Sequence, residues 1–233
     1  MKKYLLPLLL AGTFGITSCN GGGKSPSSDT MKTKTDSMKT DQVNANDTNV
    51  LEDLLTMTSE KALIDKFGKS RIKYDTVWGE EGMFDMGSYL DKGTPNQVQF
   101  TWTDSLHRSG LGGVTISQAY RADGSLNLAN NWHSKTGIHL GMKADEVQQI
   151  NGKQFKFSGV GWDYGGTVTD FEKGKLDGIG IGLSMDADYN VHSSEKDFNS
   201  VSGEQDVMSD APAVKKVGIQ VVQLFVYKPA DQK

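Results

Sequence analysis

The chain has 233 residues, a formal net charge of −4 and 36% hydrophobic residues, values of a globular protein rather than a disordered or fibrous one. It contains one cysteine. A single cysteine excludes an intramolecular disulfide and any metal site built from several cysteines, so its position carries the information.

Residues 1–19 carry two lysines, then a mostly apolar run from Leu5 to Ala11, then small or weakly polar residues that end at Cys19. This is the layout of a secretory signal, and the run is shorter than the roughly 20 residues that a membrane-spanning helix needs. It resembles a bacterial lipoprotein signal. The resemblance implies that residues 1–18 are removed and that palmitate-type lipid on Cys19 anchors the protein in the cell envelope, at the outer membrane facing the periplasm. The alternative is a signal that is discarded together with its cysteine.

Residues 20–50 contain no aromatic side chain, and their four lysines and four aspartates cancel in charge. Such a polar segment cannot bury enough apolar surface to offset the entropy lost on ordering. We therefore predict a disordered tether over residues 19–50, with a root-mean-square reach of about 30 Å.

Residues 51–233 form the predicted globular domain, with 19 basic and 25 acidic side chains. The resulting charge of −6 argues against nucleic acid as a partner and against a polybasic membrane-binding surface. The domain holds 22 of the 27 glycines and 18 of the 20 aromatic residues, a composition typical of strands and turns. We expect few helices.

Two short helices are indicated. Thr58 or Ser59 can cap the start of the first, and Gly68 can end it with a left-handed residue. The second lies between Met142 and Gly152, with acidic residues in its first turn and again a terminal glycine. Each has apolar residues on one side, which should face a core.

The regions around the two helices align when one is shifted by 84 residues. The matched pairs are Gly68 with Gly152, Trp78 with Trp162, and Gly82 with Gly166. After a shift of 81, residues 93–102 align with residues 174–183, and both segments end in the alternation of a strand. We predict two tandem copies, about residues 56–116 and 138–227, each with a helix, a glycine cap, a strand, a Trp-Gly turn and a strand.

Further strands are expected at Val114–Ile116 and at Gly218–Tyr227. The second run is apolar on both faces, which predicts a central strand covered on at least one side by helices. The predicted fold class is α+β: one antiparallel sheet with helices on one face and the other face open.

A short helix introduced by Gly-Met and closed by glycine, followed by a small antiparallel sheet and doubled in tandem, resembles the β-lactamase inhibitory protein and the small lipoproteins of outer-membrane assembly. The motif is Gly141-Met-Lys-Ala-Asp-Glu-Val147 with Gly152. Lys143 stands where the family usually has Ser or Thr, and the cysteines that brace each inhibitor repeat are absent. The resemblance implies the fold and favours a protein-binding module, although a fold does not carry its function with it.

The sequence has no signature of a serine hydrolase, a zinc protease, a P-loop or a dinucleotide site. Asp104 and His107 stand three apart at the end of a predicted strand, where their side chains should not meet. Glu80, Glu81 and Asp85 indicate a solvated acidic turn. We expect no catalytic residue, since an envelope hydrolase would need a cleft gathering groups such as His133, Asp163 or Glu80.

One segment has spacing typical of a calcium loop. Its candidate ligands are Asp186, Asp188, Asn190, His192 and Asp197. A Ca²⁺ loop takes oxygen ligands at positions 1, 3, 5 and 12 and a backbone carbonyl at 7. Val191 replaces the glycine of position 6, and Asp197 replaces the bidentate glutamate. A polar inserted loop is the alternative interpretation, in which the protein needs no cofactor.

Two aromatic turns bracketed by glycines are the candidate partner-binding sites. The first contains Trp78 and Phe84, and the second contains Trp162 and Tyr164. Such residues either fill the core at a strand end or stand exposed as anchors for a partner.

The sequence thus favours an envelope-anchored, non-enzymatic lipoprotein that binds another protein through the open sheet face and the aromatic turns. A protein that binds a small ligand or Ca²⁺ is the alternative, and an envelope hydrolase is a more distant one.

Overall fold

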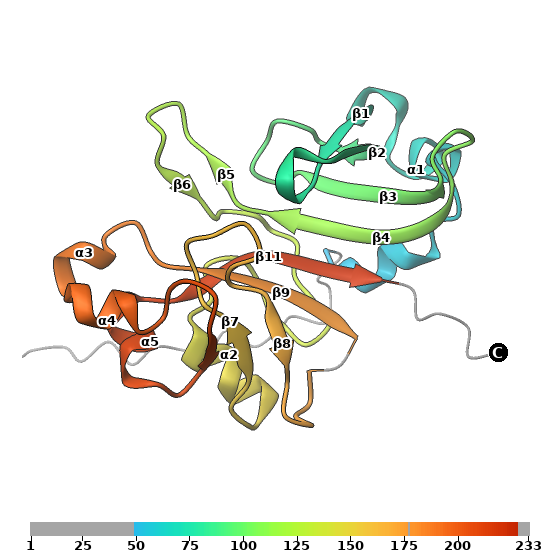
Figure 1. Ribbon diagram of the computed structural model, residues 1–233. Helices are drawn as coiled ribbons and strands as arrows, with labels where there is room; N and C mark the ends of the chain where they lie inside the picture. Colours follow the sequence, from blue (N-terminus) through green and yellow to red (C-terminus); the bar gives the residue numbers. More distant parts are fainter. Residues whose placement is uncertain (1–48, 177, 228–233) are drawn as a thin grey trace, which may run out of the picture. The chain divides into compact units, whose positions relative to one another are not determined.

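The computed structural model describes residues 49–176 and 178–227 (Figure 1). The predicted signal, Cys19 and most of the predicted tether lie outside the described residues. The first described residues are joined to the rest of the domain: the carbonyl of Asn49 accepts the N–H of His133 at 3.1 Å, and Val50 forms a parallel bridge with the same residue.

The main sheet has six strands in the order β1-β2-β3-β4-β11-β9, and every neighbouring pair is antiparallel. The strands are β1 (Ile72–Trp78), β2 (Phe84–Leu90), β3 (Val98–Asp104), β4 (Ser109–Ser117), β9 (Ile179–Ser184) and β11 (Gln220–Tyr227). The predicted central strand, β11, lies between β4 and β9. The class is therefore α+β with a mostly antiparallel sheet and few helices, as predicted.

Smaller elements complete the domain. A second sheet has the order β10-β7-β8, and β5 pairs with β6. These strands are β5 (Ala119–Tyr120), β6 (Leu126–Asn127), β7 (Lys156–Ser158), β8 (Val168–Asp170) and β10 (Asp206–Met208). The α-helices are α1 (Glu60–Phe67), α2 (Ala144–Asn151), α3 (Tyr189–His192), α4 (Glu195–Asn199) and α5 (Pro212–Val217). Short 3-10 helices cover Leu51–Thr56 (η1), Lys69–Arg71 (η2) and Glu80–Gly82 (η3).

Both predicted helices are confirmed, and each ends at the predicted glycine. The Ser59 hydroxyl accepts the N–H of Ala62 at 3.3 Å at the start of α1. Gly68 ends α1 with a φ of 90° and a ψ of 142°, which is not the predicted left-handed helical conformation. At the start of α2 the Glu146 carboxylate accepts the N–H of Lys143 at 2.7 Å. Gly152 closes α2 in the left-handed conformation, with a φ of 75°.

The core lies on one face of the main sheet, because alternate strand residues point to the same side. Leu63 of α1 and Val147 of α2 are fully buried in the same cluster as Phe100, Leu224 and other alternate strand residues. Both helices therefore cover the same face. At about 25 cal/mol per Å² of apolar surface removed from water, this cluster is the main source of stability.

The two halves of the domain attach their helices to the sheet by the same backbone contacts. We call residues 58–117 the first half and residues 142–227 the second half. In each half, the backbone carbonyl two residues before the helix accepts a hydrogen bond from a backbone N–H of the last strand, which is β4 in the first half and β11 in the second. The N–H of the first residue of the helix donates to the carbonyl of the residue that precedes the same strand. The bonds are Gly110 to Thr58 (3.0 Å), Glu60 to Arg108 (2.9 Å), Val221 to Met142 (2.8 Å) and Ala144 to Ile219 (3.0 Å).

The halves differ in one connection. Residues 105–108 join β3 directly to β4, whereas residues 185–219 between β9 and β11 contain α3, α4, β10 and α5. Figure 1 shows α3, α4 and α5 together beside one end of β9 and β11. We call residues 185–219 the insertion.

Candidate interaction surface and polar cluster

The outer end of the β1–β2 hairpin lies beyond the rest of the sheet. β1 and β2 pair over their full length, from Ile72 with Leu90 to Trp78 with Phe84. β2 pairs with β3 only from Gly87 to Leu90. The last residues of the hairpin therefore lack a third strand beside them.

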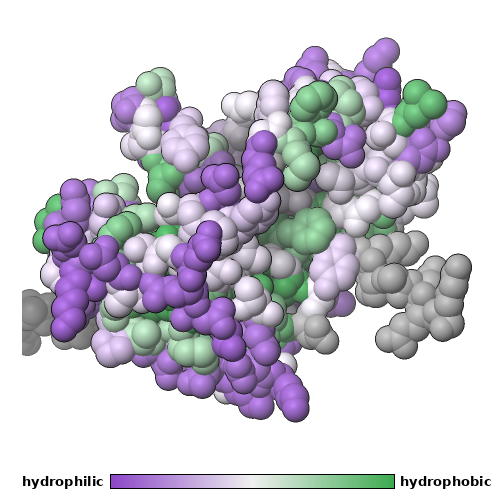
Figure 2. Space-filling view, in the orientation of Figure 1, coloured by the Kyte–Doolittle hydropathy of each residue, from purple (hydrophilic) through white to green (hydrophobic). Residues whose placement is uncertain are grey.

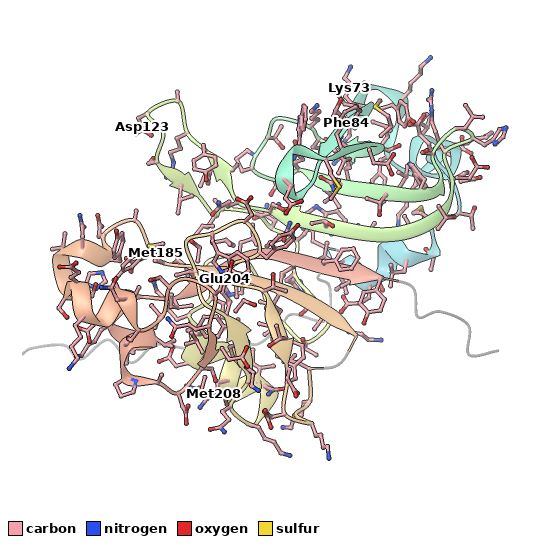
Figure 3. All side chains as sticks on the ribbon, viewed as in Figure 1. Lys73, Phe84, Asp123, Met185, Glu204 and Met208 are labelled. Carbon is pink, nitrogen blue, oxygen red and sulfur yellow. The ribbon has the colours of Figure 1, made fainter. Side chains whose placement is uncertain are left out.

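Three large apolar side chains stand exposed at this end. The exposed fractions are 70% for Trp78, 62% for Met83 and 67% for Phe84, and we call these three residues the aromatic tip. The rings of Trp78 and Phe84 lie 5.6 Å apart between centroids. Figure 2 shows hydrophobic side chains reaching the surface over the β1–β2 region, and Figure 3 shows Phe84 on this hairpin. Such exposure is unusual, because large aromatic residues are usually well buried.

The turn holds the aromatic tip outward. The Gly79 N–H donates to the Met83 carbonyl at 2.8 Å, and Gly82 has a φ of 73°, which a residue with a side chain rarely adopts. Glu81 and Asp85 are exposed beside the tip. The surface is therefore apolar with an acidic border.

The second predicted aromatic turn is packed into its own loop. Trp162 is half-buried, its Nε1–H donates to the Gly159 carbonyl at 2.8 Å, and its ring lies 5.6 Å from that of Tyr164. Tyr164 is 43% exposed. A Cβ at Gly165 would lie 2.9 Å from the Trp162 ring, so the turn depends on this glycine. Thus the first turn presents its rings to solvent, and Trp162 serves mainly to hold its own loop.

The sheet face opposite the core carries small and polar residues around two rings. A Cβ at Gly113 would lie 2.5 Å from the Phe225 ring, and one at Gly180 would lie 3.2 Å from it. Phe225 stacks on the 41% exposed Tyr227 with centroids 5.5 Å apart. Gln223, on the same side of β11, is exposed. This face is flat because glycines replace the side chains that would otherwise surround Phe225.

The segment with calcium-loop spacing forms part of the insertion. Residues Tyr189–His192 are helical as α3, whereas a calcium loop wraps its ligands around an ion. The Asp197 carboxylate accepts the Ser194 hydroxyl at 2.7 Å and pairs with Lys216 at 3.0 Å. Among the residues that the structure describes, no group of three or more His, Cys, Asp or Glu side chains is placed to hold a metal. Calcium binding stays a prediction.

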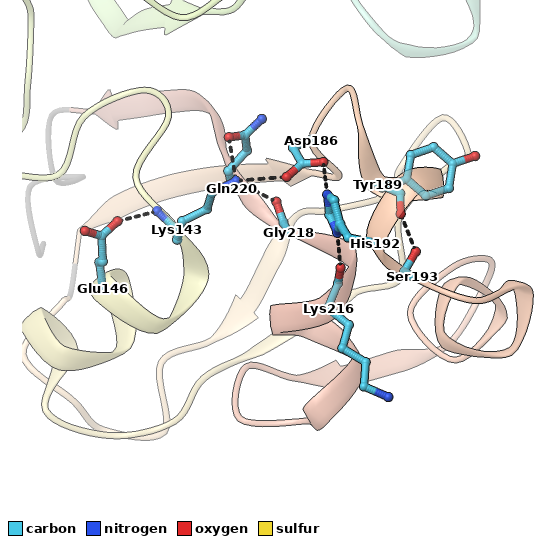
Figure 4. Close-up of polar contacts among 9 residues, drawn as sticks. All are labelled: Lys143, Glu146, Asp186, Tyr189, His192, Ser193, Lys216, Gly218 and Gln220. Carbon is cyan, nitrogen blue, oxygen red and sulfur yellow. Dashed lines mark hydrogen bonds and ion pairs between the residues drawn. The ribbon is translucent and has the colours of Figure 1, made fainter. Parts of the chain in front are cut away.

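Two of those residues belong instead to a polar cluster with Lys143 (Figure 4). The Lys143 Nζ donates to Asp186 Oδ2 at 3.2 Å, to the Gly218 carbonyl at 3.2 Å and to Gln220 Oε1 at 3.1 Å. The His192 Nε2 lies 3.2 Å from Asp186 Oδ1, and its Nδ1 lies 2.6 Å from the Lys216 carbonyl. The cluster ties the start of α2 to both ends of the insertion.

A second cluster lies at the corresponding place in the first half. The buried Glu60 carboxylate accepts Arg108 Nη1 at 2.6 Å and the buried Ser88 hydroxyl at 2.7 Å. The Trp102 Nε1–H donates to the same hydroxyl at 2.9 Å. Arg108 also lies over the Tyr74 ring, 4.0 Å from its centroid. Every charged or polar group of this cluster thus has a partner, as a buried network requires.

The expectation that Asp104 and His107 do not meet is wrong. His107 Nδ1 lies 2.7 Å from Asp104 Oδ2, and the His107 N–H donates to Oδ1 at 3.0 Å. The chain turns after β3, which brings residues three apart together. These two contacts, the backbone N–H first, lower the pKa of Asp104 below its ordinary value. Both side chains are well exposed, so the pair is a turn contact.

The sequence reasoning missed the contacts that Glu60, Arg108 and Lys143 make. The sequence drew attention to Lys143 only because it stands where the resembled family usually has Ser or Thr. Its partner Asp186 lies 43 residues away in the chain. The missed helix α5 did carry a local signal, since Pro212 is in its first turn and Gly218 follows its last residue with a φ of 70°.

No family model, curated protein or solved structure matches the chain. None of the helices in the described residues is long and apolar enough to cross a membrane.

Proposed function

We propose that this protein is a lipid-anchored protein of the bacterial cell envelope that binds another protein and catalyses no reaction. The observation that carries the binding is the aromatic tip, where Trp78, Met83 and Phe84 are each more than 60% exposed on the end of a hairpin. Trp and other aromatic residues dominate the binding energy of protein interfaces, because they bury a large area with few rotatable bonds. The flat outer face around Phe225 and Tyr227 is a second surface for the same partner.

The partner's chemistry follows from the border of the aromatic tip. Glu81 and Asp85 flank the rings, and the domain carries a charge of −6. A complementary surface has an apolar pocket bordered by lysine or arginine. A bilayer with anionic headgroups is disfavoured, because the acidic border would be repelled by them.

We also propose that the domain consists of two copies of one unit. α1, β1 and β2 begin at residues 60, 72 and 84, and α2, β7 and β8 begin at 144, 156 and 168, a constant offset of 84. β3 begins at 98 and β9 at 179, an offset of 81. The matched backbone hydrogen bonds at the two helix starts support the same pairing. In this arrangement β4 and β11 are equivalent and meet as antiparallel neighbours, and the insertion belongs to the second copy alone.

The membrane anchor is proposed from the sequence of residues 1–19. The segment that follows Cys19 is its tether, which ends before Asn49 and Val50 because these two residues are joined to the domain. Metabolic labelling with a palmitate analogue tests this. The wild-type protein should incorporate the label and fractionate with the outer membrane, and Cys19→Ser should lose both. Labelling that persists in the Cys19→Ser variant would remove the basis for the anchor.

Site-specific cross-linking tests the aromatic tip in the full-length protein. With Phe84 replaced by benzoylphenylalanine, irradiation of cells should yield one protein adduct. The same probe at Lys61, an exposed residue of α1, serves as the matched control and should not yield that adduct. For the identified partner in purified form, Trp78→Ala with Phe84→Ala should weaken binding by about tenfold or more without lowering the melting temperature, because both rings are already exposed.

Adducts to lipid instead of protein, or an affinity unchanged by the double substitution, would exclude the proposed surface. A large fall in melting temperature would show that the tip is structural.

A further inference from the structure

The start of the β1–β2 hairpin carries a basic surface within an acidic domain. Four of the eight residues from Lys66 to Lys73 are basic and none is acidic, whereas residues 51–233 have a charge of −6. Lys66, Lys69 and Arg71 are exposed around the half-buried Phe67. We call these four residues, Lys66, Phe67, Lys69 and Arg71, the basic end.

Phe67 is the apolar centre of the basic end. The Lys66 ammonium lies 5.2 Å and the Arg71 guanidinium 5.7 Å from the centroid of its ring, within the range of a cation–π contact. Asp91 accepts Arg71 Nε at 2.8 Å and offsets one positive charge. Among the residues that the structure describes, the ammonium groups of Lys66 and Lys69 have no ion-pair partner. Two positive charges of the basic end are therefore available to a partner.

The aromatic tip and the basic end are complementary in chemistry. The surface that fits the tip has lysine or arginine around an apolar area, and the basic end has this composition. The exposed carboxylates of Glu81 and Asp85 can pair with the two free ammonium groups. The exposed ring of Trp78 belongs to the residue type that attracts lysine and arginine cations most strongly.

The two surfaces lie too far apart to meet within one molecule. β1 and β2 pair over their full length, which holds the two ends of the hairpin apart. Arg71 immediately precedes β1 and Trp78 ends it, a separation of about 23 Å along a strand. A contact between tip and basic end therefore joins two copies of the chain. Each copy contributes a different surface, which is a head-to-tail arrangement.

We propose that copies of this protein associate head to tail, with the aromatic tip of one copy on the basic end of the next. This partner assignment rests on the binding role proposed above for the aromatic tip. The rings of the tip cover Phe67, and Glu81 and Asp85 face Lys66 and Lys69. The proposed lipid anchor would hold the copies in one membrane at a high effective concentration, so a weak contact is sufficient.

Sedimentation velocity of the full-length protein, in density-matched detergent with micelles in excess over protein, measures this association. The wild type should self-associate with a dissociation constant below about 1 mM. The tip variant, Trp78→Ala with Phe84→Ala, should associate at least about tenfold more weakly, and so should the end variant, Lys66→Glu with Lys69→Glu. All four side chains are exposed, so both variants should keep the melting temperature of the wild type.

A mixture of the two variants tests the head-to-tail arrangement directly. Each variant keeps the surface that the other lacks, so an equimolar mixture should associate at least about tenfold more tightly than either variant alone. Lys153→Glu with Lys196→Glu is the matched control. It makes the same change in charge at two exposed lysines of the second half and should leave self-association unchanged.

Cross-linking in cells distinguishes this contact from binding to a different protein. With benzoylphenylalanine at Phe84 and two differently tagged copies, the adduct should join both tags and map to residues 66–73. An adduct to a different protein alone would overturn the head-to-tail contact and leave the binding role of the tip intact, whereas the absence of any protein adduct would exclude both.

Three results of the sedimentation experiment would also overturn the proposal. They are a wild type that stays monomeric at the highest concentration reached, a mixture that associates no better than its components, and a control that loses as much affinity as the end variant.

Discussion

Each half of the domain has an ion pair at the start of its helix, but the charge on the helix side is negative in the first half and positive in the second. In the first half the acid is on the helix, where Glu60 pairs with Arg108 just before β4. In the second half the base precedes the helix, where Lys143 pairs with Asp186 just after β9. The backbone contacts around both pairs are the same. The same backbone arrangement thus occurs with the acidic and basic side chains exchanged. The ion pair has to join the start of the helix to the neighbouring segment of the sheet, and either partner can carry the negative charge.

The surroundings of the two pairs are different. Glu60 is enclosed by Ser88 and Arg108 and shares the network with Trp102. Lys143 lines a cavity between the start of α2 and the insertion, and its side chain is 41% exposed. The first half therefore encloses its charged pair in a buried network, and the second half leaves its charged pair partly exposed.

The largest difference is expected at the two glycines of the aromatic turns. A Cβ at Gly166 would lie 1.8 Å from the Leu183 carbonyl oxygen, whereas one at Gly82 would have no atom within 4 Å. Gly166→Ala should lower the free energy of unfolding by about 3–5 kcal/mol, since the backbone must move. Gly82→Ala should cost only the strain of its positive φ, about 1–2 kcal/mol. Urea denaturation measures both, and equal losses would contradict the packed state of the second turn.

The buried pair of the first half comes next. Glu60→Ala should lower the free energy of unfolding by about 2–3 kcal/mol. The substitution leaves the Arg108 guanidinium without its carboxylate partner and the Ser88 hydroxyl without its acceptor. Lys61→Ala is the matched control on the same helix. It removes only an exposed pair with Asp65 and should change stability by less than about 0.5 kcal/mol. A Glu60→Ala protein as stable as the control would show that the network is not needed.

The corresponding pair of the second half should matter less. Lys143→Met should cost about 1 kcal/mol, because the ammonium is partly solvated and Asp186 keeps its contact with His192. A double-mutant cycle with Asp186→Asn isolates the coupling between the two side chains. A coupling as large as that between Glu60 and Arg108 would remove the contrast between the halves.

The smallest expected effect is a pH dependence inside the insertion. Hydrogen bonds from Ser194 and then from Lys216 lower the pKa of Asp197 to about 2. Because the folded pKa lies below the ordinary 3.8, its contribution to stability is fully present above about pH 4 and is lost as the pH falls toward about 2. Carboxyl chemical shifts in an NMR titration should place the midpoint near 2, and Ser194→Ala should raise it. A midpoint near 3.8 in the wild type would show that the cap of α4 does not form in solution.

Local sequence signals were sufficient to predict the elements whose bounds depend on residues close together in the chain. Ser59, Gly68 and Gly152 marked helix ends correctly, because capping depends on residues within one turn. The run of β11, which has apolar residues on both faces, predicted a strand inside the sheet, and β11 lies between β4 and β9. The candidate aromatic residues were also recognised from the local sequence. Their exposure could not be predicted, because it depends on where β3 stops pairing with β2.

The sequence by itself determined the α+β class, the two main helices and the acidic character of the domain, because composition and short-range patterns contain these. Only the tertiary structure decided that Trp78 and Phe84 face solvent while Trp162 is packed, and that Lys143, Asp186 and His192 share one cluster. These residues are brought together or kept apart by strand register and by the insertion. The contact between Lys143 and Asp186, for example, joins residues 43 positions apart, where no local pattern connects them.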